Sequence, residues 1–300
     1  METFDPMEIA IPFLVAALAA EIVLARARRV KAHYEARDTA ASLAMAVGGL
    51  PIGLLTAGLV LSVTLWVERY ALFDISSASV LAWVVLFFAE DFVQYWSHRL
   101  SHERRIWWAS HVAHHSSQHF NLSTAMRNTW TGSFVGTWLP WLVLSFVGFP
   151  LEMIVIQSAA NQIYQFFLHV EGVGKLPRPV EFLLNTPSHH RVHHARNPVY
   201  LDRNYGGILI VWDRKFGTFQ EELDHIPARY GLTRNITSFN PLHIAFHEWV
   251  NVARDIVSAP KRALSVLLSR PGWRTDGSGK TAIEIRKAWD ATPEASSKSR

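Results

Sequence analysis

The chain has 300 residues, of which 49% are hydrophobic, and the apolar residues occur in long runs, so a membrane protein is the first interpretation. It contains no cysteine, which excludes disulfides, thiolate zinc sites, iron–sulfur clusters and a cysteine nucleophile. Its net charge of +4 suits an anionic membrane surface, and the sequence contains no recognisable nucleic-acid-binding module.

Two membrane spans are predicted at the start of the chain. Met7 to Ala25 is an apolar stretch that follows acidic residues and precedes a basic segment, 26–31. Since basic residues favour the cytoplasmic side, the C-terminal end of this span is expected in the cytoplasm. Thr39 to Val67 carries no charge and is long enough to span, and its Gly and Pro residues are tolerated in a membrane helix.

A third span is predicted from Ser76 to Trp96, and it ends next to the first histidines of the chain. Its acidic pair, Glu90 and Asp91, lies near that end. Because carboxylates at membrane depth are costly and tend to have partners, we expect the histidine-rich region to supply one.

Two further apolar stretches, Phe134 to Phe149 and Leu151 to Leu168, are separated by Gly148-Phe149-Pro150 and predict a helical hairpin that crosses or re-enters the membrane. Counting the spans from the first one places every histidine motif on the cytoplasmic side. The predicted fold is an all-α integral membrane protein with about four to five membrane helices or half-helices and a cytoplasmic helical cap. The membrane is a bacterial inner membrane or one of the endoplasmic-reticulum type.

We divide the chain into four parts. Residues 1–75 are N-terminal membrane helices, 76–220 a catalytic domain, and 221–273 a C-terminal helical region on the cytoplasmic face. Pro241 to Leu268 has helical periodicity, and we expect it to pack on the cap or to lie on the membrane surface. Residues 274–300 are polar and rich in Ser and Lys, which is typical of a partly disordered tail.

Eleven of the fifteen histidines lie in the central third of the chain: His98, His102, His111, His114, His115, His119, His169, His189, His190, His193 and His194. Their spacings, HxxxH once and HxxHH twice, place imidazoles on one face of a helix each time. Imidazole is a good ligand for iron, zinc, copper and nickel, and nine or ten such ligands exceed the needs of one ion. The sequence therefore predicts a site for two metals.

The ligands in this cluster are mostly neutral nitrogens, unlike the carboxylate-rich di-iron sites of soluble helix bundles. A more positive centre of this kind is suited to binding dioxygen or peroxide and attacking an unactivated C–H bond. The membrane setting indicates a lipid substrate that enters from the bilayer. Glu103 and Asp91 are candidates for orienting ligand imidazoles through a hydrogen bond, and they are our two candidate catalytic residues.

The order and context of these motifs resemble the fatty acid hydroxylase (sterol desaturase) superfamily, and within it the alkylglycerol monooxygenase group and its bacterial members. The stretches that carry the resemblance run from the third span to Thr218: Asp91–Glu103, His111–Thr124, Asn161–His169, Asn185–His194 and Asn204–Thr218.

The resemblance implies a non-haem centre of two iron ions, dioxygen as co-substrate and hydroxylation of a lipid. Its ligands would be nine residues: His98, His102, His111, His114, His115, His169, His190, His193 and His194. Glu103 resembles an acidic residue that matters for activity in the family. Fatty acid 2-hydroxylases have a further histidine where this chain has Gln165, so His189, Gln165 or water would complete the second iron. Electrons would come from an external reductant, either tetrahydrobiopterin or a redox protein.

Other functions remain open at this point. The same site supports desaturation as well as hydroxylation of a lipid or sterol. A zinc-dependent membrane hydrolase would need three ligands and a carboxylate base, and the chain lacks His-Glu-x-x-His. A histidine-lined metal transporter would spread its ligands over several membrane depths.

Overall fold

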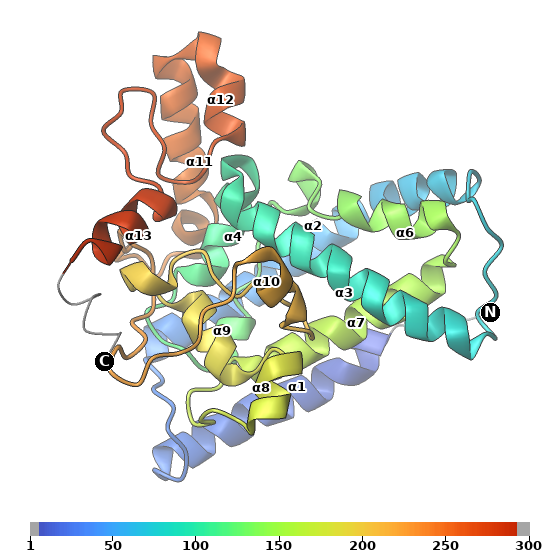
Figure 1. Ribbon diagram of the computed structural model, residues 1–300, viewed down its shortest axis with the longest axis horizontal. Coiled ribbons are helices and arrows are strands. Elements are labelled where there is room, and N and C mark those ends of the chain that lie inside the picture. Colours follow the sequence, from blue (N-terminus) through green and yellow to red (C-terminus); the bar gives the residue numbers. More distant parts are fainter. Residues whose placement is uncertain (1–5, 293–300) are drawn as a thin grey trace.

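The computed structural model describes residues 6–292, and over that range the protein consists of helices, with two isolated β-bridges and no strand (Figure 1). Its outline has two parts. A stem of long helices extends to the right in Figure 1, and a cap of shorter helices and loops lies to the left. The cap also includes the C-terminal end of α3.

Three helices are long and apolar enough to cross a membrane: α1 (Pro6–Arg26), α2 (Ala36–Glu68) and α3 (Val80–Glu103). Many of their apolar side chains face outward, and Leu54, Leu55 and Val80 are each more than 70% exposed. A protein in water would not expose so many large apolar groups on one region, whereas lipid tails solvate them. The three spans predicted from the sequence match these helices.

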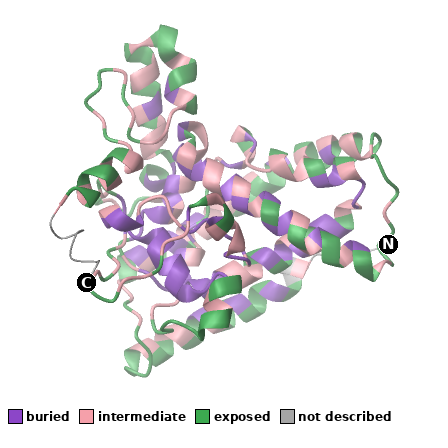
Figure 2. Ribbon diagram, in the orientation of Figure 1, coloured by how far each residue is buried: buried purple, intermediate pink, exposed green. Residues whose placement is uncertain are grey.

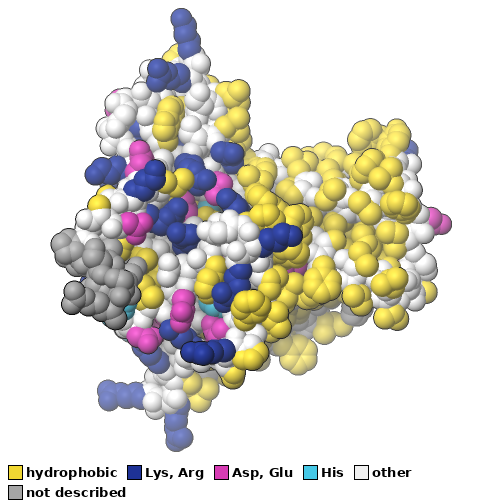
Figure 3. Space-filling model, in the orientation of Figure 1, with side chains coloured by type: hydrophobic (Ala, Val, Ile, Leu, Met, Phe, Trp, Pro, Cys, Tyr) yellow, Lys and Arg dark blue, Asp and Glu magenta, His cyan; other side chains and the backbone are white. Residues whose placement is uncertain are grey.

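The surface also divides into an apolar stem and a charged cap (Figure 3). Hydrophobic side chains cover the stem on the face shown, and Lys, Arg, Asp and Glu gather on the cap. Buried residues are concentrated in the cap, around α4 and α9 (Figure 2). The structure therefore combines an apolar stem with a polar, well-packed cap that can carry chemistry.

The predicted hairpin has only one long arm. Residues 134–149 form the short helices η1 (Ser133–Val135), η2 (Leu139–Trp141) and α6 (Leu142–Val147), and the second arm is α7 (Leu151–Leu168). The glycines at 136 and 148 have φ of 73° and 118°, conformations that end a helix, and a proline stands at position 140. Of the four to five membrane helices or half-helices predicted, three are therefore confirmed as long, apolar helices.

The remaining helices belong to the cap. They are α4 (Arg105–His115), α5 (Leu122–Ala125), α8 (Arg178–Leu183), α9 (Pro187–His194), η3 (Pro198–Tyr200), α10 (Val211–Phe216), α11 (Pro241–Ser258), η4 (Pro260–Arg262), α12 (Ala263–Leu268) and α13 (Ala282–Asp290). Helix α13 lies within the tail expected to be partly disordered, and a capping box between Thr281 and Glu284 begins it. Residues 293–300 of that tail lie outside the described residues.

Helix α11 packs on the cap, one of the two positions expected for it. Ile244 and Ala245 are buried against Ala41 and Met45 of α2. The buried guanidinium of Arg105 on α4 binds two carboxylates of α11, Glu248 at 2.9 Å and Asp255 at 2.5 Å. A buried cation paired with two carboxylates holds α11 against α4, because leaving any of these charges unpaired is costly.

Candidate metal centre

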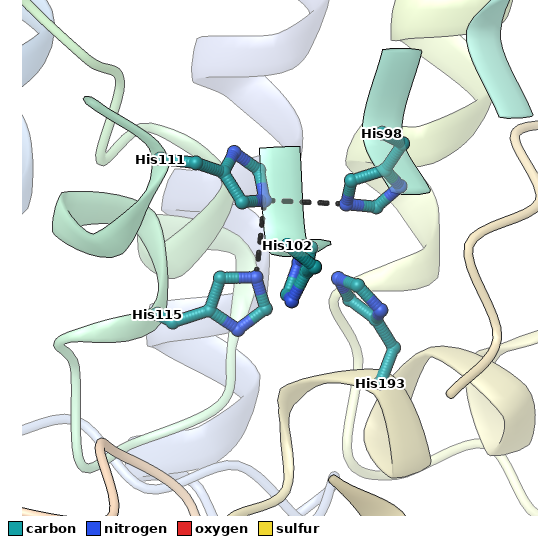
Figure 4. A group of neighbouring side chains, drawn as sticks. All are labelled: His98, His102, His111, His115 and His193. Carbon is teal, nitrogen blue, oxygen red and sulfur yellow. Dashed lines mark hydrogen bonds between the residues drawn. The ribbon is translucent and has the colours of Figure 1, made fainter. Parts of the chain in front are cut away.

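Nine histidines lie together in the cap, and their nitrogens form two groups in which all ligand atoms are within 4.8 Å of one another. Group A consists of His98, His102, His111, His115 and His193 (Figure 4), and group B of His114, His169, His190 and His194. These nine are the residues that the family resemblance implies as ligands. Their role in metal binding stays a prediction.

Each HxxHH motif contributes to both groups. Helix α4 gives His111 and His115 to group A and His114 to group B, whereas α9 gives His190 and His194 to group B and His193 to group A. Residues i and i+4 share a helix face, and the direction changes by about 100° from i+3 to i+4. The second histidine of each HxxHH motif therefore points into a different group from the other two. Each of the two helices thus contributes ligands to both groups.

The remaining members come from two other helices. His98 and His102 are one turn apart on α3, near its C-terminal end, and His169 follows the last residue of α7. The ends of α3 and α7 thus position histidines from the stem against those of the cap.

The spacing of the nitrogens fits a metal ion in each group. In group A the Nε2 atom of His111 lies 3.2 Å from that of His98 and 3.1 Å from that of His115 (Figure 4). In group B the Nε2 atom of His169 lies 3.3 Å from that of His114 and 3.1 Å from that of His190. For a metal–nitrogen bond of about 2.1 Å, ligand nitrogens lie about 3.0 Å apart at an octahedral edge and about 3.4 Å at a tetrahedral one.

Backbone carbonyls fix the tautomer of three of these rings. The Nδ1–H groups of His98, His193 and His169 donate to the carbonyl oxygens of Tyr205, Arg203 and Gln165, at 3.0, 3.0 and 2.9 Å. Because a carbonyl only accepts, the proton is on Nδ1 and each Nε2 keeps its lone pair free for a metal.

Several Nε2 atoms in the centre are buried and have no hydrogen-bond partner among the described residues. They belong to His102, His193 and His194. Buried polar atoms are rarely left unsatisfied, and lone pairs that face one another at 3.1–3.3 Å repel unless a cation lies between them. The donor set therefore fits metal ions that prefer imidazole.

Burial keeps these imidazoles neutral. It lowers the pKa of His111, His114, His190 and His194 well below the usual 6.5, and neighbouring histidines lower it further. The pKa of His169 is lowered to about 4, again mainly by burial. Neutral imidazole is the form that binds a metal. Metal binding at neutral pH therefore does not require these histidines to lose a proton first.

We expect the metal-free protein to lose stability as the pH falls below about 6.5. The unfolded chain binds protons on these histidines there, and the folded protein does not until the pH reaches the lowered pKa values. Each such histidine removes about 1.4 kcal/mol of stability per pH unit in that window. Thermal unfolding in detergent at pH 7.5 and 5.5, with and without metal, measures the effect. Equal stability of the metal-free protein at both pH values would contradict it.

His189, the reserve ligand, does not belong to either group. Its Nε2 lies 2.8 Å from Oε2 of Glu181, and its ring packs edge-on against Phe219. It precedes His193 on α9 by one helical turn, but its side chain contacts the Glu181 carboxylate and lies outside both groups. The amide of Gln165 also has its own partner, since its Nε2 donates to Oδ1 of Asn161 at 2.8 Å.

Asp91 and Glu90 do not contact the histidines, contrary to our expectation. Asp91 accepts hydrogen bonds from the backbone N–H groups of Ile208 and Leu209, at 2.6 and 3.2 Å, and from Nε1 of Trp212 at 2.9 Å. Glu90 accepts from the side chains of Trp141, Ser158 and Asn161. The amides and indoles of distant segments satisfy these buried carboxylates, which makes Asp91 an anchor for the loop before α10.

Glu103 lies near the centre without touching it. Its carboxylate binds Arg99 of the same helix and Arg270, both at 3.0 Å. Arg270 also lies 3.9 Å from Asp202, whose Oδ1 is 3.5 Å from Nδ1 of His102. Glu103 is therefore connected to a ligand candidate through two charged residues, and its catalytic role stays a prediction.

Asp202 was not singled out from the sequence. It is the only carboxylate within 4 Å of one of the nine histidines in the described part of the chain. Asp202 and Asn204 have φ of 51° and 57°, the left-handed region that Asp and Asn tolerate best among residues other than glycine. The only signal in the sequence is the neighbouring motif that begins at Asn204, which carries part of the family resemblance.

The motif Asn204 to Gly207 positions His98 of group A through its backbone. Asp213 accepts from the N–H groups of Tyr205 and Gly206 at 2.8 and 2.7 Å, which fixes the carbonyl that holds His98. A Cβ on Gly207 would lie 2.5 Å from Oδ1 of Asn161, so only glycine fits there.

Comparisons with known proteins agree with this architecture. Residues 83–218 match the fatty acid hydroxylase family. Alkylglycerol monooxygenase of Homo sapiens is 34% identical over 289 residues, which is 95% of this chain and 63% of that protein. The enzyme of Xenopus tropicalis is 39% identical over 222 residues, or 73% of this chain and 48% of that protein.

A further relative is ornithine lipid hydroxylase OlsE of Rhizobium tropici, 29% identical over 139 residues, or 46% of this chain and 40% of that protein. The chain spans between about half and two thirds of the length of the alkylglycerol monooxygenases that it matches. No solved structure matches the chain. Residues 83–218, which carry every histidine of groups A and B, therefore form a fatty acid hydroxylase domain.

Proposed function

We propose that this protein is a membrane di-iron monooxygenase that hydroxylates a lipid with dioxygen. The observation that carries the proposal is the pair of adjacent histidine groups, A and B, at the end of an apolar helical stem. Nine neutral ligands hold two ions without a carboxylate in either group. Two iron ions in this place would supply the activation of dioxygen and the oxidation of a C–H bond.

The side chains around the centre orient its ligands and exclude water. The carbonyls of Tyr205, Arg203 and Gln165 hold three rings in place. The ring of Phe120 is stacked on that of His169 with centroids 5.5 Å apart, and Tyr230 is stacked on Phe120 at 4.9 Å. These aromatic rings cover group B and lower the dielectric around it, which strengthens each metal–ligand interaction.

The lipid substrate and the cytoplasmic location follow from the stem. The basic segment after α1 contacts the cap, because Lys31 binds Glu171 at 3.1 Å and Asn121 donates to the carbonyl of His33 at 2.7 Å. Basic loops favour the cytoplasmic side, so the cap and its histidines are proposed to lie there. A glycerol ether, an acyl lipid or a sterol-like molecule would enter from the bilayer, and an external reductant, tetrahydrobiopterin or a redox protein, would supply electrons.

Desaturation of a lipid or sterol on the same site is the second candidate, and a sterol oxidase is among the relatives. Lathosterol oxidase of Homo sapiens is 29% identical over 155 residues, or 50% of this chain. The zinc hydrolase and the metal transporter are less well supported. Neither group contains a carboxylate base, and both groups lie at one end of the stem instead of at several depths.

Asp202→Asn is expected to weaken metal binding in group A by about 10- to 100-fold, since a carboxylate that orients a ligand histidine contributes that much. Asn tolerates the left-handed backbone at this position, so the fold is preserved. Iron retained during titration with a chelator measures the effect. Asp224→Asn, at an exposed carboxylate that pairs with Lys175, is the matched control. Equal retention in both variants would contradict the role of Asp202.

Lipid analysis tests the proposed function directly. Cells that express the wild-type protein are compared with cells that express a His115→Ala variant. We expect a lipid with one additional oxygen that depends on the wild-type centre. A product that has lost two hydrogens would favour desaturation, and the absence of any oxidised lipid under aerobic conditions with reductant would argue against both.

A further inference from the structure

A cavity of about 1120 Å³ extends from the histidines into the cap. Its walls come from α4, α11, the loop 231–236 and the segment that leads into α13. Four of the nine histidines line it, three from group A (His102, His115 and His193) and one from group B (His194). The cavity is thus a route by which a molecule can reach both metal groups without passing through the stem.

The exposure of the lining residues distinguishes the inner end of the cavity from its mouth. The four histidines are buried, each at most 5% exposed, so they form the inner end. Arg234, Arg254 and Lys280 also line the cavity and are exposed, so they lie at its mouth. A molecule that fills the cavity would place one end against the histidines and the other against these cations.

The mouth has an excess of positive charge. The carboxylates that line the cavity are already paired, Glu248 and Asp255 with Arg105, and Asp202 with Arg270. Asp255 also lies 3.8 Å from Arg274. In the described part of the chain, Arg234, Arg254 and Lys280 have no carboxylate within 4 Å, although Glu284 is near enough to Lys280 to interact with it weakly. These three cations are available for an anionic group.

An apolar row on α11 and α4 forms part of the cavity wall, next to polar side chains such as those of Glu248 and Asn251. Leu242, Phe246 and Val250 are spaced four residues apart on α11 and all line the cavity, although each is more than 36% exposed. Trp108 and Val112 of α4 line it as well. Residues four apart share a helix face, so α11 presents an apolar row to the cavity. This explains why these large side chains remain uncovered on a helix whose other face is packed.

The volume of the cavity suits a ligand with one long chain. If a methylene group occupies about 30 Å³, the share of one water molecule, an 18-carbon chain fills about 540 Å³. One such chain with its head group fits into 1120 Å³, whereas two chains already fill the cavity and leave no room for a head.

From this arrangement we infer that the cavity binds a single-chain amphiphile with an anionic head, a carboxylate or a phosphate monoester. The head contacts Arg234, Arg254 and Lys280, and the chain lies along α11 towards the histidines. The inference names the substrate class of the proposed oxidation, and in that respect it rests on the proposed function. The binding itself requires only the cavity.

Photo-crosslinking tests the inference without turnover. The purified full chain in a neutral detergent is labelled with dodecyl phosphate that carries a diazirine at the end of its chain, and the labelled peptides are identified by mass spectrometry. We expect labelling of α4 and α11 near Trp108, Val112 and Phe246. Unlabelled dodecyl phosphate or dodecanoate should compete about tenfold better than dodecylglycerol, which has the same chain and no charge, and the preference should diminish at high salt. Comparing the two anions distinguishes a phosphate from a carboxylate head.

Two matched variants locate the head group. Arg254→Glu is expected to reduce labelling about tenfold, because an attraction at the mouth becomes a repulsion. Lys261→Glu makes the same charge change on η4, outside the cavity, and should leave labelling unchanged. Val250→Trp, which narrows the cavity without changing charge, should also reduce labelling.

Labels outside the cavity, equal competition by the neutral amphiphile, or equal effects of Arg254→Glu and Lys261→Glu would overturn the inference. Its failure is separable from that of the proposed function, since labelling needs neither iron nor dioxygen. Correct labelling together with no oxidised product from any anionic amphiphile would reject the proposed reaction and leave the binding site in place.

Discussion

Replacing His111 by Ala is expected to reduce the bound iron from about two ions per chain to about one and to lower the oxidation rate at least about 100-fold. The Nε2 atom of His111 lies 3.2 and 3.1 Å from those of His98 and His115, so it is central to group A. Losing a ligand costs more than losing a residue that only orients one, for which the effect is already about 10- to 100-fold. Metal analysis and the rate of lipid oxidation measure the two effects.

Group B provides a second test of the same claim. His190→Ala should also remove about one ion, and the double variant should bind almost none, because each histidine belongs to a different group. His225→Ala is the matched control, since His225 is exposed and lies outside both groups. If a single substitution removes all the iron, or if His225→Ala has the same effect as His111→Ala, the division into two groups is wrong.

Asp91→Ala is expected to destabilise the folded protein by about 3–5 kcal/mol, because each buried donor left without its acceptor costs about 1–3 kcal/mol. Its carboxylate is fully buried and accepts from Ile208, Leu209 and Trp212, and the substitution leaves these donors unsatisfied. The loop that holds the carbonyl against His98 would shift as a consequence, so iron should be lost together with stability.

Chemical unfolding in detergent, followed in parallel with iron content, measures both effects of Asp91→Ala. Asp74→Ala, at an exposed carboxylate in the loop between α2 and α3, should change neither. A purely catalytic role for Asp91 predicts the opposite pattern, in which the variant keeps its stability and iron and loses only its rate. That result would restore the expectation drawn from the sequence and contradict the anchoring role.

The long helices and the grouping of histidines could be predicted because both depend on local sequence. Uninterrupted apolar runs specify α2 and α3, and the spacing of His98 and His102 follows from the helical repeat. The division of each HxxHH motif between two groups differs from the prediction, which placed all its imidazoles on one helix face. The angle of about 100° between consecutive residues directs His114 and His115 into different groups.

The partners of the buried carboxylates could not be predicted, because they depend on contacts between distant segments. Asp91 binds backbone groups 117 and 118 residues away, and Asp202 meets His102 through the folding of the loop after α9. The broken first arm of the hairpin is a different case. Apolar composition predicted a helix there, but the left-handed backbone of Gly136 and the proline at position 140 interrupt it.

The origin of the oxygen atom in the product tests the central claim most directly. The iron-loaded protein is incubated with lipid extract, a reductant and ¹⁸O₂, and the products are analysed by mass spectrometry. We predict a lipid that has gained one ¹⁸O atom, and that is not formed by His111→Ala. An oxygen that derives from water, or a product formed equally well by the protein that carries zinc in place of iron, would contradict a di-iron monooxygenase.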